Sequence, residues 1–337
     1  MEIQQAISLQ QLNSFGVPAT AAYLAKVETA ADLEEALGFA EAENLSIQVL
    51  GSGSNVLFVR DFPGLVLHIA NKGIEWGDAT ADDSSALRVA AGENWHGLVS
   101  SCLQKGLYGL ENLALIPGTV GAAPIQNIGA YGVELADFFV DVTVFDRETK
   151  QWLVMDKQAC EFAYRDSLFK GAGLGRYIVF NLSLSLSSQW VPNLSYQGLK
   201  EALGNTEPTP QDVFDAVCQI RRSKLPDPSV IGNAGSFFKN PIISLEKFKS
   251  LEEQLPGLPK YDTGEEGLTK IPAGWLLEKL GWKGRTRGAA AVSDNHALVI
   301  VNPGEADGED ILLLAQEMSN SVLQTYGIAL EPEVRIL

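Results

Sequence analysis

Apolar and polar positions near the N-terminus switch between a helical and a strand period. Thr29, followed three residues later by Asp32, is a typical N-terminal cap for an amphipathic helix that runs to about Ala42. Short apolar runs predict strands at residues 47–50, 56–59 and 65–69. The first part of the chain is therefore expected to mix helices and strands.

The clearest strand signal lies at residues 177–186. Leu182, Leu184 and Leu186 alternate there with polar residues, as in a strand that buries one face. Weaker patterns predict strands at 87–91, 140–145 and 152–155, and a helix at 95–104 that ends at Gly106.

A helix signal in the last third begins at Thr209, with Pro210 at the first helical position. The run Leu-Pro-Asp-Pro at 225–228 ends this helix, because a residue before proline avoids the helical conformation. This run is the predicted domain boundary. Beyond it the pattern predicts helices near 244–255, 273–280 and 309–325, a strand at 297–301 and a terminal strand at 331–337.

Composition limits the class of protein. The 337 residues are 46% hydrophobic, enough for two or three domains with sizeable cores. The formal net charge of −17 argues against nucleic acid or an anionic membrane as a partner, although a local basic pocket for a phosphorylated ligand stays open. No long apolar run predicts a transmembrane helix, and residues 1–15 do not read as a signal peptide. We therefore expect a cytoplasmic protein.

Cysteine and histidine are too sparse to suggest a metal site or a disulfide framework. Cys102, Cys160 and Cys218 lie far apart, which fits a reducing compartment. The three histidines form no Cys/His cluster with zinc-ligand spacing, so no metal is expected.

Residues 51–55, Gly-Ser-Gly-Ser-Asn, connect two predicted strands. A Rossmann fingerprint needs a helix after its glycines, and a P-loop needs Gly-Lys-Ser/Thr; neither is present. A glycine-rich turn can still direct successive N–H groups at a pyrophosphate. An ordinary hairpin loop explains these five residues equally well.

Residues 116–132 form a longer segment of small, uncharged residues. Glycine lets backbone approach a ligand closely. A loop of this length without a helical or strand period is uncommon in a compact domain unless it is functional. We predict that it lines a flat ring system and an extended phosphate chain, with a buried structural loop as the alternative.

Two further positions are candidates for chemistry. Ser236 lies in a glycine- and phenylalanine-rich turn after the predicted boundary, where it can donate a proton beside a flat cofactor or simply cap the turn. Arg165 lies among aromatic residues and suits a bidentate grip on a carboxylate, although a surface ion pair with Asp166 is the simpler interpretation.

Taken in order, these segments resemble the UDP-N-acetylenolpyruvoylglucosamine reductases of bacterial cell-wall synthesis. The resemblance covers most of the chain, and its motifs are specific only in combination. Residues 282–296 depart from the family pattern. The motifs lie at residues 13–16, 51–57, 92–95, 109–132, 164–167, 224–228, 232–241 and 331–335.

The resemblance implies an α+β fold of the vanillyl-alcohol-oxidase type that binds FAD noncovalently, with NADPH as co-substrate. It implies that NADPH reduces the flavin, and that the flavin then passes hydride to the enolpyruvyl ether of UDP-N-acetylglucosamine to form UDP-N-acetylmuramate. The expected domains are two FAD-binding subdomains at 1–70 and 71–225 and a substrate domain at 226–327, with strand 328–337 returning to the second subdomain. A monomer is expected.

The resemblance also implies roles for individual residues. Arg165 and Glu333 contact the substrate carboxylate, and Ser236 protonates the second carbon. Glu333 must then be protonated or otherwise compensated, because two bare carboxylates repel. The FAD contacts implied are Gly51, Ser52, Gly53, Ser54, Asn55, Pro117, Gly118, Gly121, Ala122, Ile125, Gly129 and Arg335, and the substrate contacts are Tyr164, Tyr196, Lys224, Asn240, Tyr261 and Lys283.

Two other functions stay open from the sequence. An oxidoreductase of the same flavin fold with another substrate would not need Ser236, Arg165 and Glu333 together. A nonenzymatic protein that binds nucleotide sugars would be colourless, whereas a flavoenzyme is yellow.

Overall fold

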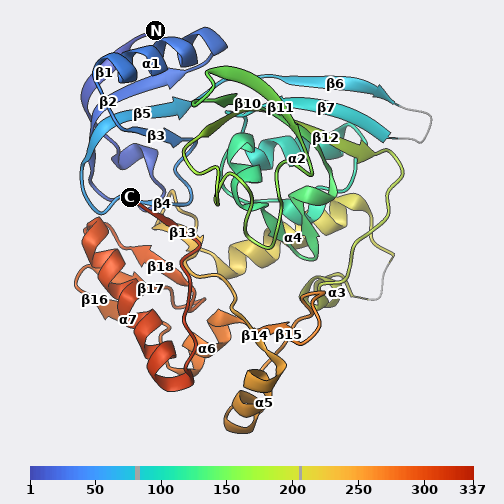
Figure 1. Cartoon of the computed structure of the whole chain (residues 1–337). Helices are drawn as coiled ribbons and strands as arrows, with labels where there is room; N and C mark the ends of the chain where they lie inside the picture. The colour runs from blue at the N-terminus through green and yellow to red at the C-terminus, as the bar shows by residue number, and fades with distance from the viewer. Residues whose placement is uncertain (80–83, 205–206) are drawn as a thin grey trace. The chain divides into compact units, whose positions relative to one another are not determined.

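The computed structural model describes residues 1–79, 84–204 and 207–337 (Figure 1). The chain forms two compact units, and both are discontinuous in sequence. Unit 1 comprises Met1–Ile7, Ala21–Gly53 and Pro63–Arg222. Unit 2 comprises Ser8–Thr20, Ser54–Phe62 and Ser223–Leu337.

The N-terminal sheet has the strand order β1-β2-β5-β3 and carries helix α1 (Figure 1). The predicted cap is confirmed: the Thr29 side chain accepts from the N–H of Asp32, and the Asp32 carboxylate accepts from the N–H of Thr29. Buried Leu33 and Ala36 of α1 pack into the core formed with the sheet. The elements are β1 (Ile3–Ser8), β2 (Thr20–Val27), α1 (Ala30–Ala42), β3 (Ile47–Leu50) and β5 (Phe62–Ile69).

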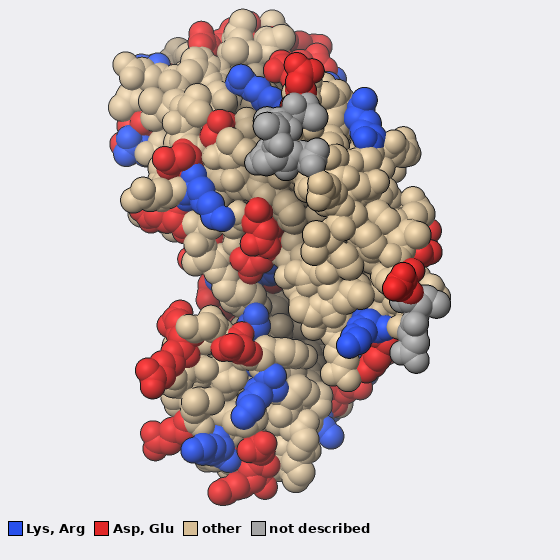
Figure 2. All heavy atoms as spheres, turned by 90° about the vertical axis from the view of Figure 1, so that its right-hand side faces the viewer, with Lys and Arg blue, Asp and Glu red and all other residues tan. Residues whose placement is uncertain are grey.

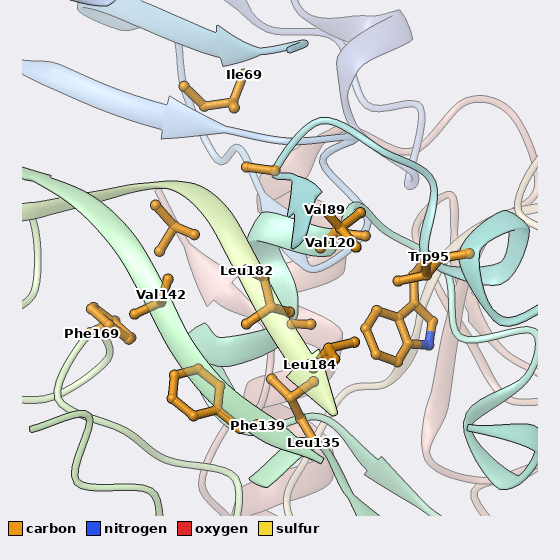
Figure 3. Close-up of a cluster of buried hydrophobic side chains, with 14 of the residues drawn as sticks. Ile69, Val89, Trp95, Val120, Leu135, Phe139, Val142, Phe169, Leu182 and Leu184 are labelled. Atoms are coloured by element: carbon orange, nitrogen blue, oxygen red, sulfur yellow. The ribbon is translucent and has the colours of Figure 1, made fainter. Parts of the chain in front are cut away.

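A five-stranded antiparallel sheet of order β11-β10-β12-β7-β6 forms the rest of the unit 1 framework. The predicted alternation in β12 is confirmed, because Leu182, Leu184 and Leu186 are all buried. Figure 3 shows Leu182 and Leu184 grouped with Trp95, Val120 and other apolar side chains of this core. The strands are β6 (Ile74–Ala79), β7 (Ser84–Ala90), β10 (Phe139–Asp146), β11 (Gln151–Asp156) and β12 (Tyr177–Ser187).

Helices and short turns in unit 1 connect these strands. The helix predicted at 95–104 is confirmed, and the one predicted from Thr209 begins at Pro210. Segment 116–132 differs from the expectation of a loop without a period, since part of it forms a 3-10 helix around Pro124. The elements are α2 (Trp95–Gln104), η2 (Glu111–Leu113), η3 (Val120–Gln126), β8 (Gly129–Ala130), β9 (Val133–Glu134), η4 (Leu135–Asp137), α3 (Gln197–Leu203) and α4 (Pro210–Lys224).

Unit 2 is built around a sheet of order β13-β18-β17-β16 with α7 packed beside it (Figure 1). The three helices predicted after the boundary are all present. The elements are η1 (Gln10–Leu12), β13 (Gly232–Ser236), β14 (Ile242–Ser244), α5 (Leu245–Gln254), β15 (Leu268–Lys270), α6 (Ala273–Lys279), β16 (Thr286–Arg287), β17 (Ala290–Val292), β18 (Val299–Asn302) and α7 (Gly308–Tyr326).

The terminal strand β19 (Arg335–Ile336) pairs in parallel with β4 (Val56–Leu57). The sequence-based expectation placed this strand beside residues 71–225 instead. The difference has a physical reason, because a two-residue strand carries too little pattern to specify its partner. As a result, the segment after the 51–55 turn belongs to unit 2 together with the chain end.

Charge and hydropathy of the structure add two facts. Among the described residues, no helix is long and apolar enough to cross a membrane. Figure 2 shows one face of the molecule, on which Asp and Glu side chains are interspersed with Lys and Arg. On that face, basic side chains therefore lie among the acidic ones that give the chain its negative net charge.

Candidate active site

Unit 1 brings the two glycine-rich segments into direct contact. A Cβ atom on Gly51 would lie 2.3 Å from Oγ1 of Thr119, a distance that real Cβ atoms do not adopt. Glycine is thus required at position 51 for this approach. Gly51, at the start of the first glycine-rich turn, therefore lies directly against Thr119 of segment 116–132.

The first segment leaves backbone donors for a ligand. Within the described residues, the N–H groups of Ser52 and Gly53 donate to no protein acceptor, and Gly53 is buried. Gly53 has φ +66, which an L-residue adopts only at a cost. Buried N–H groups are normally paired, so the N–H of Gly53 fits an acceptor such as the pyrophosphate of FAD, while Ser52 is exposed.

The second segment is held in place by the residues just before α2. The N–H of Trp95 donates to the carbonyl of Gly118 at 3.1 Å, and the N–H of Gly121 donates to that of Ala91 at 2.8 Å. A Cβ on Gly121 would lie 2.5 Å from the Cβ of Ala91. Pro117, Gly118, Gly121, Ala122 and Ile125 therefore follow a rigid path, as a binding surface for a large planar cofactor requires.

Asn127 ends this 3-10 helix in the left-handed conformation, with φ +44. Its buried amide donates to the carbonyl of Ala163 at 3.2 Å and to Oε2 of Glu134 at 2.7 Å. Its Oδ1 accepts from the N–H of Ala136 at 3.0 Å. Asn127 thereby ties the glycine-rich segment to the turn that contains Arg165.

Arg165 lies at the tip of a tight turn. The backbones of Ala163 and Asp166 form a two-way hydrogen-bonded bridge, and Arg165 has φ +54. Its guanidinium donates to the carbonyl of Gly129 at 2.6 Å and lies 5.7 Å from the ring of Tyr164. A non-glycine residue in this conformation is uncommon and clusters at functional sites.

Arg221 and Tyr131 accompany Arg165 in unit 1. Burial lowers the pKa of Arg221, the bonded hydroxyl of Tyr131 opposes this, and the nearby Arg165 lowers it further. The ring of Tyr131 meets that of Tyr196 edge to face at 5.0 Å. The sequence did not predict this grouping, because Tyr131 and Arg165 lie far from Arg221 in the chain.

Unit 2 places Ser236 and Glu333 on adjacent backbone segments. Ser236 ends β13, and the next residue, Phe237, accepts from the N–H of Glu333 at 2.8 Å. Gly235, with φ +69, turns the chain before the serine, and Asn233 Oδ1 accepts from its N–H at 3.0 Å. The two side chains expected to contact the reacting group therefore come from neighbouring segments of one unit.

The end of the first glycine-rich turn joins the same region of unit 2. The Asn55 amide donates to the carbonyl of Glu333 at 3.2 Å, and the N–H of Arg335 donates to the carbonyl of Asn55 at 3.0 Å. Burial lowers the pKa of Arg335. Asn55 and Arg335 are thus tied to the backbone segment that contains Glu333.

Lys224 and Lys283, two expected substrate contacts, both act electrostatically on His296 in unit 2. The pKa of His296 is lowered by burial first, then by Lys224 and by Lys283, while Glu278 opposes the shift. Lys283 also forms an ion pair with Glu278 at 2.7 Å. This arrangement keeps both lysines within electrostatic reach of one ring, which suits an anion such as a diphosphate.

The remaining substrate candidates have different environments. Asn240 Oδ1 accepts from the N–H of Ala273 at 3.0 Å, at the start of α6. Tyr261 is 44% exposed and its backbone pairs with Lys270. Asn240 is therefore already engaged through its oxygen, whereas the Tyr261 ring faces solvent.

Metal and thiol chemistry find no support in the described parts of the chain. No group of three or more His, Cys, Asp or Glu among the described residues has a geometry for a metal ion. All three cysteines are buried thiols, and burial raises the pKa of Cys102 and of Cys160 to about 12. A thiol with such a pKa is protonated and unreactive near neutral pH.

Comparison with known proteins agrees with this geometry. A family profile described as FAD binding domain matches residues 21–152. A second profile, described as UDP-N-acetylenolpyruvoylglucosamine reductase, C-terminal domain, matches residues 227–337. The FAD-binding α+β fold expected from the sequence is confirmed.

Curated relatives and a solved structure extend over the whole chain. The UDP-N-acetylenolpyruvoylglucosamine reductase of Ralstonia nicotianae is 46% identical over 326 residues, which cover 95% of each chain. That of Amoebophilus asiaticus is 44% identical over 342 aligned positions and covers all of both chains. The crystal structure of the reductase from Thermus caldophilus superposes with a TM-score of 0.70 at 26% identity, covering 100% of this chain and 99% of the other. The chain belongs to the UDP-N-acetylenolpyruvoylglucosamine reductases, a family of FAD-dependent oxidoreductases.

Proposed function

We propose that this chain reduces the enolpyruvyl ether of UDP-N-acetylglucosamine to UDP-N-acetylmuramate, with NADPH as reductant and FAD as cofactor, in bacterial peptidoglycan synthesis. The observation that carries the proposal is the identity of 46% with a reductase of this name across 95% of the chain. Two observations support it: in unit 1, Gly51 lies against Thr119 of the second glycine-rich segment, and in unit 2, Ser236 and Glu333 lie on adjacent backbone segments.

Residues 51–55 and 116–132 hold the FAD in this proposal. Gly51, Ser52 and Gly53 direct N–H groups at its pyrophosphate, and the small residues of the second segment lie against its flat ring system. Arg335, lodged beside Asn55, completes the set. When bound, FAD supplies the hydride relay from NADPH to the enolpyruvyl group.

The acid-base part of the reaction belongs to three side chains. Hydride addition to the terminal carbon of the enolpyruvyl group moves negative charge into the adjoining carboxylate. Arg165 and Glu333 hold this carboxylate, and the guanidinium stabilises the charge as it develops. Ser236 donates its hydroxyl proton to the second carbon, which sets the configuration of the lactyl product. Glu333 must be protonated or otherwise compensated in this role, because two bare carboxylates repel.

The nucleotide part of the substrate is held by charged, polar and aromatic residues. Lys224 and Lys283 provide positive charge for the diphosphate, and Asn240 provides hydrogen bonds. Tyr164, Tyr196 and Tyr261 pack against the sugar and base with their rings. The same proposal includes a monomeric enzyme that works in the cytoplasm, where UDP-linked precursors and NADPH are made.

The two half-reactions test this function directly. Under anaerobic conditions NADPH should bleach the flavin of the purified protein, and the enolpyruvyl nucleotide should restore its colour without oxygen. Colourless protein would instead support a nonenzymatic binding protein. Bleaching without recovery on adding the enolpyruvyl nucleotide would point to an oxidoreductase of the same fold with a different substrate.

A further inference from the structure

His96 accepts a backbone hydrogen bond at the entrance to segment 116–132. It is the second residue of α2, and its Nδ1 accepts from the N–H of Leu115 at 3.0 Å. Its ring stacks on that of Phe214 in α4, with centroids 5.4 Å apart and planes 13° from parallel. Contacts from two different elements therefore fix the orientation of this ring.

Leu115 is held on both sides of its backbone. It has φ +57, in the left-handed region that costs an ordinary residue about 1–2 kcal/mol. Its N–H is bound by His96, and its carbonyl oxygen accepts from Nε of Arg221 at 3.1 Å. The strained conformation is thus supported by one side chain from α2 and one from α4.

The conformation of Leu115 matters because its carbonyl oxygen binds the side chain of Arg221. This half-buried side chain is hydrogen-bonded to the hydroxyl of Tyr131, and the nearby charge of Arg165, which is also half-buried, lowers the pKa of Arg221. Two like charges in a partly buried place favour the binding of an anion, because the anion relieves their repulsion. A displaced Arg221 would weaken that attraction.

We propose that His96 is a positioning residue, which holds Leu115 in the left-handed conformation whose carbonyl oxygen fixes Arg221 near Arg165. The anion that Arg221 and Arg165 attract is the substrate carboxylate, so this inference rests on the proposed function. His96 itself touches neither substrate nor cofactor in this proposal.

The role of His96 requires a neutral ring. An accepting Nδ1 carries a lone pair, so the ring proton must lie on Nε2. Burial lowers the pKa of His96, and the cationic Arg222 and Arg221, both on α4, lower it further. Protonation would replace the lone pair by an N–H that faces the N–H of Leu115, and the hydrogen bond would be lost.

Three variants distinguish the hydrogen-bond acceptor of His96 from the stacking of its ring on Phe214. His96→Phe keeps an aromatic ring for Phe214 but has no acceptor. His96→Asn loses the stack, while its side-chain oxygen can take the place of Nδ1. His68→Phe is the control, since His68 is a half-buried histidine of β5 outside this network. Each variant is purified with its flavin, and the enolpyruvyl nucleotide is titrated against the oxidised protein by the change in the flavin spectrum.

We expect His96→Phe to raise the dissociation constant of the enolpyruvyl nucleotide about tenfold, the effect of one lost hydrogen bond. His96→Asn should stay close to the parent, and so should His68→Phe. In the parent the affinity should fall as the pH drops through the lowered pKa of His96, which lies below the ordinary histidine value of about 6.5, and this loss should be smaller in His96→Asn.

Histidine ring ¹⁵N spectra provide a readout that does not depend on substrate. The chain has three histidines, and the His96 signals are identified by their absence in His96→Asn. An unprotonated Nδ1 at about pH 7 supports the proposal, and a protonated one overturns it. Unchanged affinity in His96→Phe at every pH also overturns it. If His96→Phe does not retain flavin, the test is the loss of affinity for the enolpyruvyl nucleotide at low pH in His96→Asn. A loss equal to that of the parent rejects the positioning role of His96. Failure of the parent to recover its colour with the enolpyruvyl nucleotide counts against the proposed function and not against the geometry of His96.

Discussion

The backbone N–H of Glu333 donates to the carbonyl oxygen of Phe237, the residue after Ser236, at 2.8 Å. This single bond connects segments that lie almost a hundred positions apart in sequence. It places the proposed proton donor and the proposed carboxylate-binding acid on neighbouring backbone segments of one unit. Their spacing therefore does not depend on a flexible connection.

Ser236→Ala should separate the two half-reactions. Bleaching of the flavin by NADPH should stay nearly intact, because the hydroxyl takes no part in that step. Reoxidation by the enolpyruvyl nucleotide should slow by roughly 10²–10⁴, the usual contribution of a general acid. Stopped-flow absorbance of the flavin measures both rates. Ser229→Ala, which changes an exposed serine of the same unit, is the control, and equal reoxidation rates in the two variants would reject the assignment.

Gly51→Ala should damage the flavin site through a single methyl group. The new Cβ would lie 2.3 Å from Oγ1 of Thr119, so the Thr119 side chain or the backbone of one of the two glycine-rich segments must move. We expect a loss of about 1–3 kcal/mol of stability and a lower ratio of flavin to protein. Thermal melting and the visible absorbance of the purified variant measure these two effects.

A double variant checks that the clash is the cause. The variant Gly51→Ala/Thr119→Ala lacks Oγ1 of Thr119, the atom that would clash with the new Cβ. Its flavin content should recover in part. Gly38→Ala is the matched control, since no atom lies within 4 Å of its new Cβ and alanine suits the interior of α1. If the double variant binds no more flavin than Gly51→Ala, the contact with Thr119 does not explain the defect.

Asn127→Gly should loosen the turn that presents Arg165. Glycine accepts the left-handed backbone of this position but removes the hydrogen bonds to Ala163, Glu134 and Ala136. We expect a lower melting temperature and an enolpyruvyl-nucleotide dissociation constant raised about tenfold, in line with the loss of one anchoring hydrogen bond. Asn44→Gly is the control, because Asn44 has φ +50 while its side chain forms no hydrogen bond within the described residues. Equal behaviour of the two variants would show that only the backbone conformation matters.

Asp146→Asn should change the pH dependence of stability. The side chain of Arg176 binds both carboxylate oxygens of buried Asp146, at 2.9 and 2.7 Å, and holds its pKa well below the usual range. A lowered pKa in the folded state stabilises the protein above the unfolded pKa of about 3.9, and the gain disappears as the pH falls through the folded value.

The melting temperature of Asp146→Asn should therefore lie several degrees below that of the parent near neutral pH, and the difference should shrink below about pH 4. Melting curves between about pH 7 and pH 3 measure this. Asp78→Asn, at an exposed position of β6, should follow the parent throughout. A constant difference across the range would mean that the charge of Asp146 is not the source of its effect.

Local elements were predictable because their signals are local. The Thr29 cap, the alternation in β12 and the proline start of α4 each lie within a few residues and survived in the structure. The pairing of β19 with β4 was not predictable, since two residues specify no register. The contacts of Tyr131, His96 and Arg221 could not be predicted for the same reason. Their partners are distant in sequence, and only the fold brings them together.

The parallel pair of β4 and β19 has a consequence for how the chain folds. Asn55 and Glu333, which bond beside this pair, are 278 residues apart, and the longest part of unit 1, Pro63–Arg222, lies between them in sequence. Closing so long a loop is entropically costly unless the intervening chain is already compact. Unit 1 should therefore gain protection from amide hydrogen exchange first during refolding. The residues around Glu333 would be among the last to become ordered, so the appearance of catalytic activity would report completion of the whole chain.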